Sequence, residues 1–193
     1  MRTLILIFGA LVLSFAGVAT ANAQNETYTG TVISYGTGRN VRTYTNTFTL
    51  RITGQTSDTE VDRLVGILQE SGQDELLKSI DDRELGRFSI GAGVGRPLNA
   101  VRIDEVNGKK RIRAIFARWM SFGEIRGGYR SVDYPFGYLE LLIDPETGKG
   151  DGTFIEAAQI RWKRDKGSNE YVVEIENFGT FPARLMGVQS RGN

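Results

Sequence analysis

Apolar and polar residues alternate along much of this chain, which is the pattern of half-buried β-strands. The stretch TYTNTFTLRIT, residues 43 to 53, alternates in this way and carries threonines on one face. Its other face is apolar: Tyr44, Phe48, Leu50 and Ile52. This period of two predicts a strand with one buried face. An earlier strand is predicted over Thr27–Tyr35, and the loop GTGRN joins the two.

One segment, SDTEVDRLVGILQESGQDELLKSIDD, departs from this period and has helical spacing. Ser57 or Asp58 is a suitable N-cap, and Gly72 should end a first helix before a second, shorter one begins. The apolar positions of the two helices are Val61, Leu64, Val65 and Leu68, then Leu76, Leu77 and Ile80. Both helices are acidic on their outer faces, so we expect them to pack on a sheet by their apolar faces.

Alternating runs resume after this short acidic helical insertion, which spans about residues 57–82. VRIDEV and KKRIRAIFARW flank Asn107-Gly108, the strongest local signal of a β-hairpin. The later runs are YPFGYLELLID, GDGTFIEAAQIRWK, EYVVEIEN and a last strand near ARLMGV. About nine or ten strands beside two short helices predict a mainly β fold, a single-domain antiparallel β-sandwich or barrel.

The N-terminal residues have a composition of their own. Arg2 precedes an apolar run from Leu4 to Val18, and Ala21-Asn22-Ala23 follows as a small-x-small cleavage motif. This predicts a secretory signal peptide over residues 1–23, with a retained amphipathic anchor as the alternative. The run is shorter than the roughly 20 residues of a membrane-spanning helix, so we expect no transmembrane segment. Residues 24–193 are then one exported β-rich domain, periplasmic or extracellular.

Charge gives no sign of a nucleic-acid partner, because the chain has 24 basic and 23 acidic side chains. The two signs are nevertheless separated along the sequence. Residues 58–84 are mainly acidic, and residues 87–130 are mainly basic. Such an asymmetry can steer a partner or pair the two segments with each other, and ordinary solvated faces are the alternative.

The chain contains neither histidine nor cysteine. Ser-His-Asp and Cys-His catalysis, disulfides, and metal sites built on imidazole or thiolate are therefore excluded. Calcium could use only oxygen ligands, for which Asp144, Glu146 and Asp151 are the nearest candidates. Their stretch, DPETGKGDG, lacks the spacing of a calcium loop and is typical of a turn. We expect no metal site and no cofactor.

The glycines of FSIGAGVGRPLN, residues 88–99, raise the question of a phosphate-binding loop. Gly91, Gly93 and Gly95 are spaced two apart, and Arg96 stands where a dinucleotide fingerprint has its third glycine. Pro97 then leads into another strand instead of a helix that could receive a phosphate. These glycines fit a bulged strand edge that lies close to a neighbouring strand or to a ligand.

Catalysis by carboxylates survives these exclusions. Glu140 and Glu156 are the weak candidates for catalytic residues, because two carboxylates that enter one cavity from neighbouring strands can act as the acid and base of a glycoside hydrolase. Strand parity groups Glu156 with Phe154, Ala158, Ile160 and Trp162. A salt bridge, with Arg118 neutralising one carboxylate, is the alternative.

Aromatic residues and arginines gather between residues 118 and 138. The segment SFGEIRGGYRSVDYPFG is glycine-rich and loop-like, so we expect a surface that recognises a sugar, a peptide or a lipid head group. Burial in the core is the alternative. The candidate binding residues are Arg118, Trp119, Arg126, Tyr129, Arg130 and Tyr134.

Three runs carry a resemblance to known proteins: SGQDELLKSI, DYPFGYLELLID with GKGDGT, and IENFGTFPARLMGV. Together they resemble those of a group of small exported bacterial proteins without an assigned activity. The resemblance implies export and one compact domain, and it transfers no catalytic residue.

Two functions from different classes remain. The first is an exported non-catalytic binding or structural domain of the bacterial cell envelope, whose partner is a small apolar ligand, a glycan or another envelope protein. The second is a carboxylate-dependent hydrolase that acts on glycans.

Overall fold

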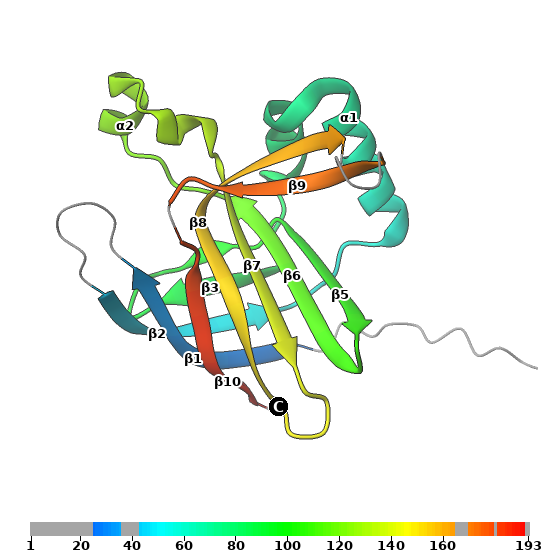
Figure 1. Cartoon of the computed structure of the whole chain (residues 1–193), viewed down its shortest axis with the longest axis vertical. Helices are drawn as coiled ribbons and strands as arrows, with labels where there is room; N and C mark the ends of the chain where they lie inside the picture. Colours follow the sequence, from blue (N-terminus) through cyan, green and yellow to red (C-terminus); the bar gives the residue numbers. More distant parts are fainter. Residues whose placement is uncertain (1–24, 36–42, 165–169, 180, 192–193) are drawn as a thin grey trace, which may run out of the picture.

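The computed structural model of this chain describes residues 25–35, 43–164, 170–179 and 181–191. Its ten strands form one antiparallel sheet that curls around an interior (Figure 1), in the order β4-β3-β2-β1-β10-β8-β7-β6-β5, with β9 paired to β8. The strands are β1 (Glu26–Tyr35), β2 (Thr43–Ile52), β3 (Gly86–Ile90), β4 (Arg96–Pro97), β5 (Ala100–Val106), β6 (Lys109–Ala117), β7 (Phe136–Ile143), β8 (Lys149–Arg164), β9 (Tyr171–Asn177) and β10 (Ala183–Arg191). The expected mainly β, antiparallel fold is confirmed.

The interior of the curled sheet is filled by apolar side chains from β1, β2, β3, β5, β6, β7, β8 and β10. Phe88 lies at its centre, with ring centroids 5.7 Å from Phe48 and 5.0 Å from Phe154. The predicted apolar face of β2 is buried toward the end of the strand, where Phe48 and Leu50 lie in the core. Near its start the face is not buried, since Tyr44 is 61% exposed. We call this layer the interior core.

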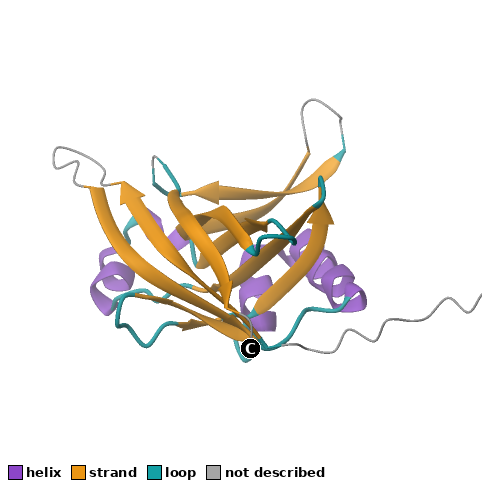
Figure 2. Ribbon diagram, turned by 90° about the horizontal axis from the view of Figure 1, so that it is seen from below, coloured by secondary structure: helices purple, strands orange, loops and turns teal. Residues whose placement is uncertain are grey.

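The two edges of the sheet meet where β4 runs into β5, although the sheet is not closed as a barrel. Leu98 lies beside β3, since Leu85 N donates to Leu98 O at 2.8 Å and Leu98 N donates to Gly86 O at 2.9 Å. One residue later, Asn99 N donates to Ile115 O of β6 at 3.0 Å. The chain therefore crosses from one edge to the other between these two residues, and the molecule is an open barrel (Figure 2).

The helix α1 (Asp58–Ile80) covers part of the outer face of the sheet. Ser57 caps it by accepting a hydrogen bond from Glu60 N, and Gly72, with φ 80° and ψ −172°, divides it into two helical parts as the sequence predicts. A second cluster lies between α1 and the outer faces of β7 and β8, and its members are Leu64, Leu68, Leu76, Ile80, Ala100, Phe136, Ile155, Ala158 and Ile160. We call it the outer core.

The strand β8 contributes to both cores because it contains a β-bulge. Tyr138 pairs with Ile155, but Phe136 pairs with Ala158, so Glu156 and Ala157 together lie opposite Gly137. The parity predicted from the sequence is therefore wrong beyond this point: Phe154 belongs to the interior core, whereas Ala158 and Ile160 belong to the outer core.

Two further turns agree with the sequence. Asn107 and Gly108 have φ values of 51° and 72° and join β5 to β6 in the predicted hairpin. In the glycine-rich stretch between β3 and β4, Gly95 has φ 77°, and a Cβ atom there would lie 2.7 Å from Phe88 O. Gly95 therefore allows the close approach of β3.

The part of the chain that the structure describes contains no helix long and apolar enough to cross a membrane. The predicted signal peptide and the loop GTGRN lie outside the described residues, so both remain predictions.

Candidate functional site

Two adjoining cavities of about 500 and 510 Å³ lie at one end of the barrel. They share four lining residues, namely Ser34, Arg118, Phe154 and Glu156. We call the two cavities together the barrel mouth. The rings of Tyr35 and Tyr129 line one cavity, and Trp119 lines the other.

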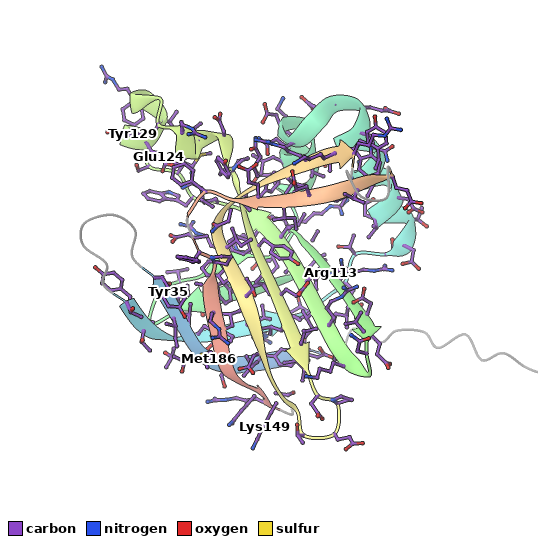
Figure 3. The ribbon with its side chains drawn as sticks, in the orientation of Figure 1. Tyr35, Arg113, Glu124, Tyr129, Lys149 and Met186 are labelled. Carbon is purple, nitrogen blue, oxygen red and sulfur yellow. The ribbon has the colours of Figure 1, made fainter. Side chains whose placement is uncertain are left out.

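The segment between β6 and β7 forms one wall of the barrel mouth. It consists of α2 (Phe122–Gly127) and the 3₁₀ helix η1 (Arg130–Asp133). Ser121 caps α2 by accepting from Glu124 N, and Gly128 ends it in the left-handed conformation. In Figure 3, Glu124 and Tyr129 lie in this wall, Tyr35 lies below them, and Arg113 lies farther to the right, near β6.

Arg118 holds this wall in place. Its guanidinium donates to a Glu124 carboxylate oxygen at 2.6 Å, to Ser131 O at 2.8 Å and to Tyr134 O at 2.9 Å. Glu124 also accepts from the Ser131 hydroxyl. The hydrogen bonds from Arg118 and Ser131 hold the pKa of Glu124 below its ordinary value, so this carboxyl is an ionised structural group.

Tyr134 anchors the end of the same wall. Its side chain is buried, its hydroxyl donates to Glu176 at 2.7 Å, and its ring lies 5.1 Å from that of Phe178. The hydrogen bond to Glu176 raises the pKa of Tyr134. The neighbouring Asp133 O accepts from Gln73 at 3.0 Å, which also ties the wall to α1.

Large aromatic rings of the barrel mouth are exposed to solvent. Trp119 is 63% exposed, Tyr129 is 64% exposed and Phe181 is 67% exposed. The Arg96 guanidinium lies 5.8 Å from the centre of the Trp119 ring, and Tyr35 meets Phe181 edge-on at 6.5 Å. Exposed rings gathered around one hollow are typical of a recognition site.

The structure brings together four of the candidate residues, since Arg118, Trp119, Tyr129 and Glu156 all line the barrel mouth. Tyr134 is buried behind it and serves as an anchor. Arg126 and Arg130 are exposed on α2 and η1, away from the lining of the two cavities.

Glu140 lies elsewhere, on the outer face of β7. Its carboxylate accepts from the Tyr138 hydroxyl at 2.9 Å, and its Cα is paired with Arg113 on one side and Thr153 on the other. Burial of Tyr138, together with the neighbouring Glu140 charge, raises the pKa of Tyr138. Glu140 does not line the barrel mouth, so the structure does not bring Glu140 and Glu156 into one cavity.

The sequence reasoning missed Tyr35, Arg96, Phe178 and Phe181, which also line the barrel mouth. The two phenylalanines follow β9 in the glycine- and proline-containing run NFGTFP, which is a local sign of exposed aromatic residues. Tyr35 gives no such sign, because its place depends on the pairing of β1 with β10.

The candidate calcium loop is a capped turn. Asp144 accepts hydrogen bonds from Glu146 N at 2.9 Å and from Thr147 N at 3.0 Å. These bonds lower the pKa of Asp144, as expected of a carboxylate that caps its own turn. No group of acidic side chains suited to hold a metal ion occurs among the described residues.

Comparisons of this chain with family models, with curated proteins and with solved structures found no match. The function must therefore be argued from the barrel mouth itself.

Proposed function

We propose that this protein is an exported, non-catalytic binding domain that holds a short uncharged stretch of glycan in the barrel mouth. The observation that carries the proposal is the gathering of exposed aromatic rings around a shared floor, in which the polar residues Ser34, Arg118 and Glu156 lie beside Phe154. The predicted signal peptide supports the exported location.

The chemistry of the barrel mouth is complementary to a sugar. A pyranose has an apolar C–H face and an edge of hydroxyl groups, so it needs a flat ring and nearby hydrogen-bond partners. Trp119, Tyr129 and Tyr35 supply flat rings. Glu156 makes no hydrogen bond or ion pair with another described residue, so both its oxygens are open to accept from hydroxyl groups.

The charges of the barrel mouth favour an uncharged ligand. The charged residues of its lining are Arg96, Arg118, Glu124 and Glu156, which leaves no excess of either sign. A strongly anionic or cationic ligand would meet like charge at this floor. A glycan without charged groups avoids that cost.

The same carboxylates argue against hydrolysis. Glu124 is committed to Arg118 and Ser131, and Glu140 lies on the outer face of β7. Among the described residues, no second carboxylate without a hydrogen-bond partner lines the barrel mouth beside Glu156. Both the retaining and the inverting mechanisms usually need such a pair.

Calorimetric titration of the full chain with short neutral oligosaccharides tests the proposal. We expect saturable binding that Trp119→Ala and Glu156→Gln each weaken about tenfold, the scale of one lost aromatic or charged contact. Phe122→Ala is the matched control, because Phe122 is 74% exposed on α2 and lies outside the cavity lining.

Three outcomes would contradict the proposal. These are absence of binding to all the oligosaccharides, an equal loss in the Phe122→Ala control, and the release of new reducing ends that Glu156→Gln abolishes. The last result would establish the hydrolase instead.

A further inference from the structure

A third cavity, of about 400 Å³, lies between α1 and the outer face of the sheet and shares no lining residue with the barrel mouth. Its size falls within the range of small-molecule pockets, about 300–1,000 Å³. Its wall is mostly aliphatic, with Val61, Leu64 and Val65 from α1, and Ile115, Ile160 and Val173 from the sheet. We call it the helix cavity.

One side of the helix cavity is bordered by charged side chains. On the outer face of β5 and β6, Ala100 is paired with Ile115. The next pair on the same face, two residues further along each strand, is Arg102 with Arg113. All four residues line the cavity. The cavity therefore has an apolar body and a charged border of two guanidinium groups and the Asp104 carboxylate, with a net positive charge, which suits an amphiphile with an anionic head group.

Arg113 has an unused hydrogen-bond donor at this border. Its Nη2 donates to Asp104 at 2.8 Å, whereas its Nε is buried and makes no hydrogen bond within the described residues. Asp104 also accepts two bonds from Arg111, at 2.8 and 2.6 Å. Asp104 is therefore held mainly by Arg111, and Arg113 is held to it by a single hydrogen bond. A buried donor without a partner is rare enough to require an explanation.

Arg102 is only loosely engaged. It pairs with Asp58, whose side chain is 82% exposed at the start of α1. An ion pair of this kind is weak in water. Arg102 is thus available as a second donor beside Arg113.

We infer that the helix cavity binds a single-chain amphiphile, with the alkyl chain under α1 and a carboxylate head group at Arg113 and Arg102. Guanidinium groups bind carboxylates through paired N–H donors, and both Arg113 and Arg102 line the cavity and are partly exposed. The aliphatic wall then removes the alkyl chain from water. This site goes beyond the glycan site of the barrel mouth and does not depend on it.

Titration of the full chain with dodecanoate, below its micelle concentration, tests this inference by calorimetry and by native mass spectrometry. We expect one molecule bound per chain and much weaker binding of dodecylamine, whose ammonium would face the two arginines. Arg113→Met should weaken the binding of dodecanoate about tenfold, the loss expected for a hydrogen bond to a charged group. Arg126→Met is the matched control, since Arg126 is exposed on α2 and lines none of the three cavities.

A second variant tests the cavity without touching the head-group site. Val65 is half-buried in the cavity wall, and Val65→Trp should fill the space and abolish binding while near-UV circular dichroism stays native. The inference is overturned if dodecanoate does not bind, if dodecylamine binds equally well, if folded Val65→Trp still binds, or if the Arg113→Met and Arg126→Met losses are equal. Trp119→Ala must leave dodecanoate binding unchanged, which separates this result from the test of the barrel mouth.

Discussion

At the scale of single residues, Asn99 joins three parts of the fold. Its side chain is buried, with Nδ2 donating to Arg83 O at 2.9 Å and Oδ1 accepting from Ala117 N at 2.7 Å. These bonds tie the segment after α1 to the end of β6. Asn99 thus fixes the point at which the two edges of the sheet meet. Arg118, which follows Ala117 in the sequence, begins the wall of the barrel mouth.

We predict that Asn99→Ala lowers the free energy of unfolding by about 2–3 kcal/mol, because it leaves a buried backbone N–H and a carbonyl without their partner. Urea unfolding measures the change. Asn46→Ala is the control, since Asn46 is exposed on β2 and should alter stability by less than about 0.5 kcal/mol. Equal effects of the two substitutions would refute the role given to Asn99.

At the scale of elements, α1 shows how a local sequence signal sets a tertiary contact. Gly72 adopts a backbone conformation that is nearly confined to glycine, and it turns the second half of the helix. The next residue, Gln73, then accepts from Ile160 N of β8 at 3.3 Å and donates to Asp133 O beside the barrel mouth. The break in the helix therefore serves to place Gln73.

We predict opposite effects for two glycines of this helix. Gly72→Ala should destabilise the protein by about 1–3 kcal/mol, because alanine is strained at φ 80° and ψ −172°. Gly66→Ala should stabilise it by about 0.5–1 kcal/mol, since a Cβ atom there meets nothing within 4 Å and alanine favours the helix. Thermal melts of both variants give the signs, and a shift in the same direction for both would contradict the interpretation.

The elements were predictable to different degrees for physical reasons. The hairpin at Asn107-Gly108, the cap at Ser57 and the break at Gly72 depend on neighbours within a few residues, so the sequence contains the whole signal. The bulge at Glu156 and Ala157 depends on the partner strand β7, which lies across the sheet. Parity counted along β8 alone could not reveal it, and it misplaced Ala158 and Ile160.

At the scale of the whole molecule, the candidate site is an assembly of distant segments. Ser34 and Tyr35 end β1, Trp119 follows β6, and Phe181 precedes β10. The sequence predicted Trp119 and Tyr129 because they lie in one aromatic segment. It could not add Tyr35 or Phe181, because their meeting requires β1 and β10 to be neighbours in the sheet.

An ion pair between Glu60 of α1 and Arg83 joins the helix to the segment that follows it. Such a pair makes the free energy of unfolding depend on pH. A hydrogen bond from Arg63, helped by Arg83, lowers the pKa of Glu60 from 4.5 to about 2. A carboxyl whose pKa is depressed on folding stabilises the protein above its unfolded pKa, and this stabilisation is lost as the pH falls. The loss from Glu60 should therefore occur between about pH 4.5 and pH 2.

We predict that Glu60→Gln lowers stability at neutral pH and flattens the pH dependence in this window. Denaturant unfolding of the parent and the variant at a series of pH values measures both effects. Glu70→Gln, at an exposed position of the same helix, is the control and should keep the parental slope. A Glu60→Gln curve parallel to that of the parent would show that the ion pairs with Arg63 and Arg83 do not contribute.

The bulge in β8 has a consequence for how this fold can diverge. Because Glu156 and Ala157 share one position of the sheet, deletion of Ala157 would leave Ile155 and Ala158 facing α1, and every β8 residue before it would keep its face. A descendant with that one-residue deletion would retain both cores, but it would lose Ala157, which lines the barrel mouth and whose carbonyl accepts from Phe178 N. Sequence length at this single point therefore separates inheritance of the scaffold from inheritance of the part of the barrel mouth that Ala157 and Phe178 form.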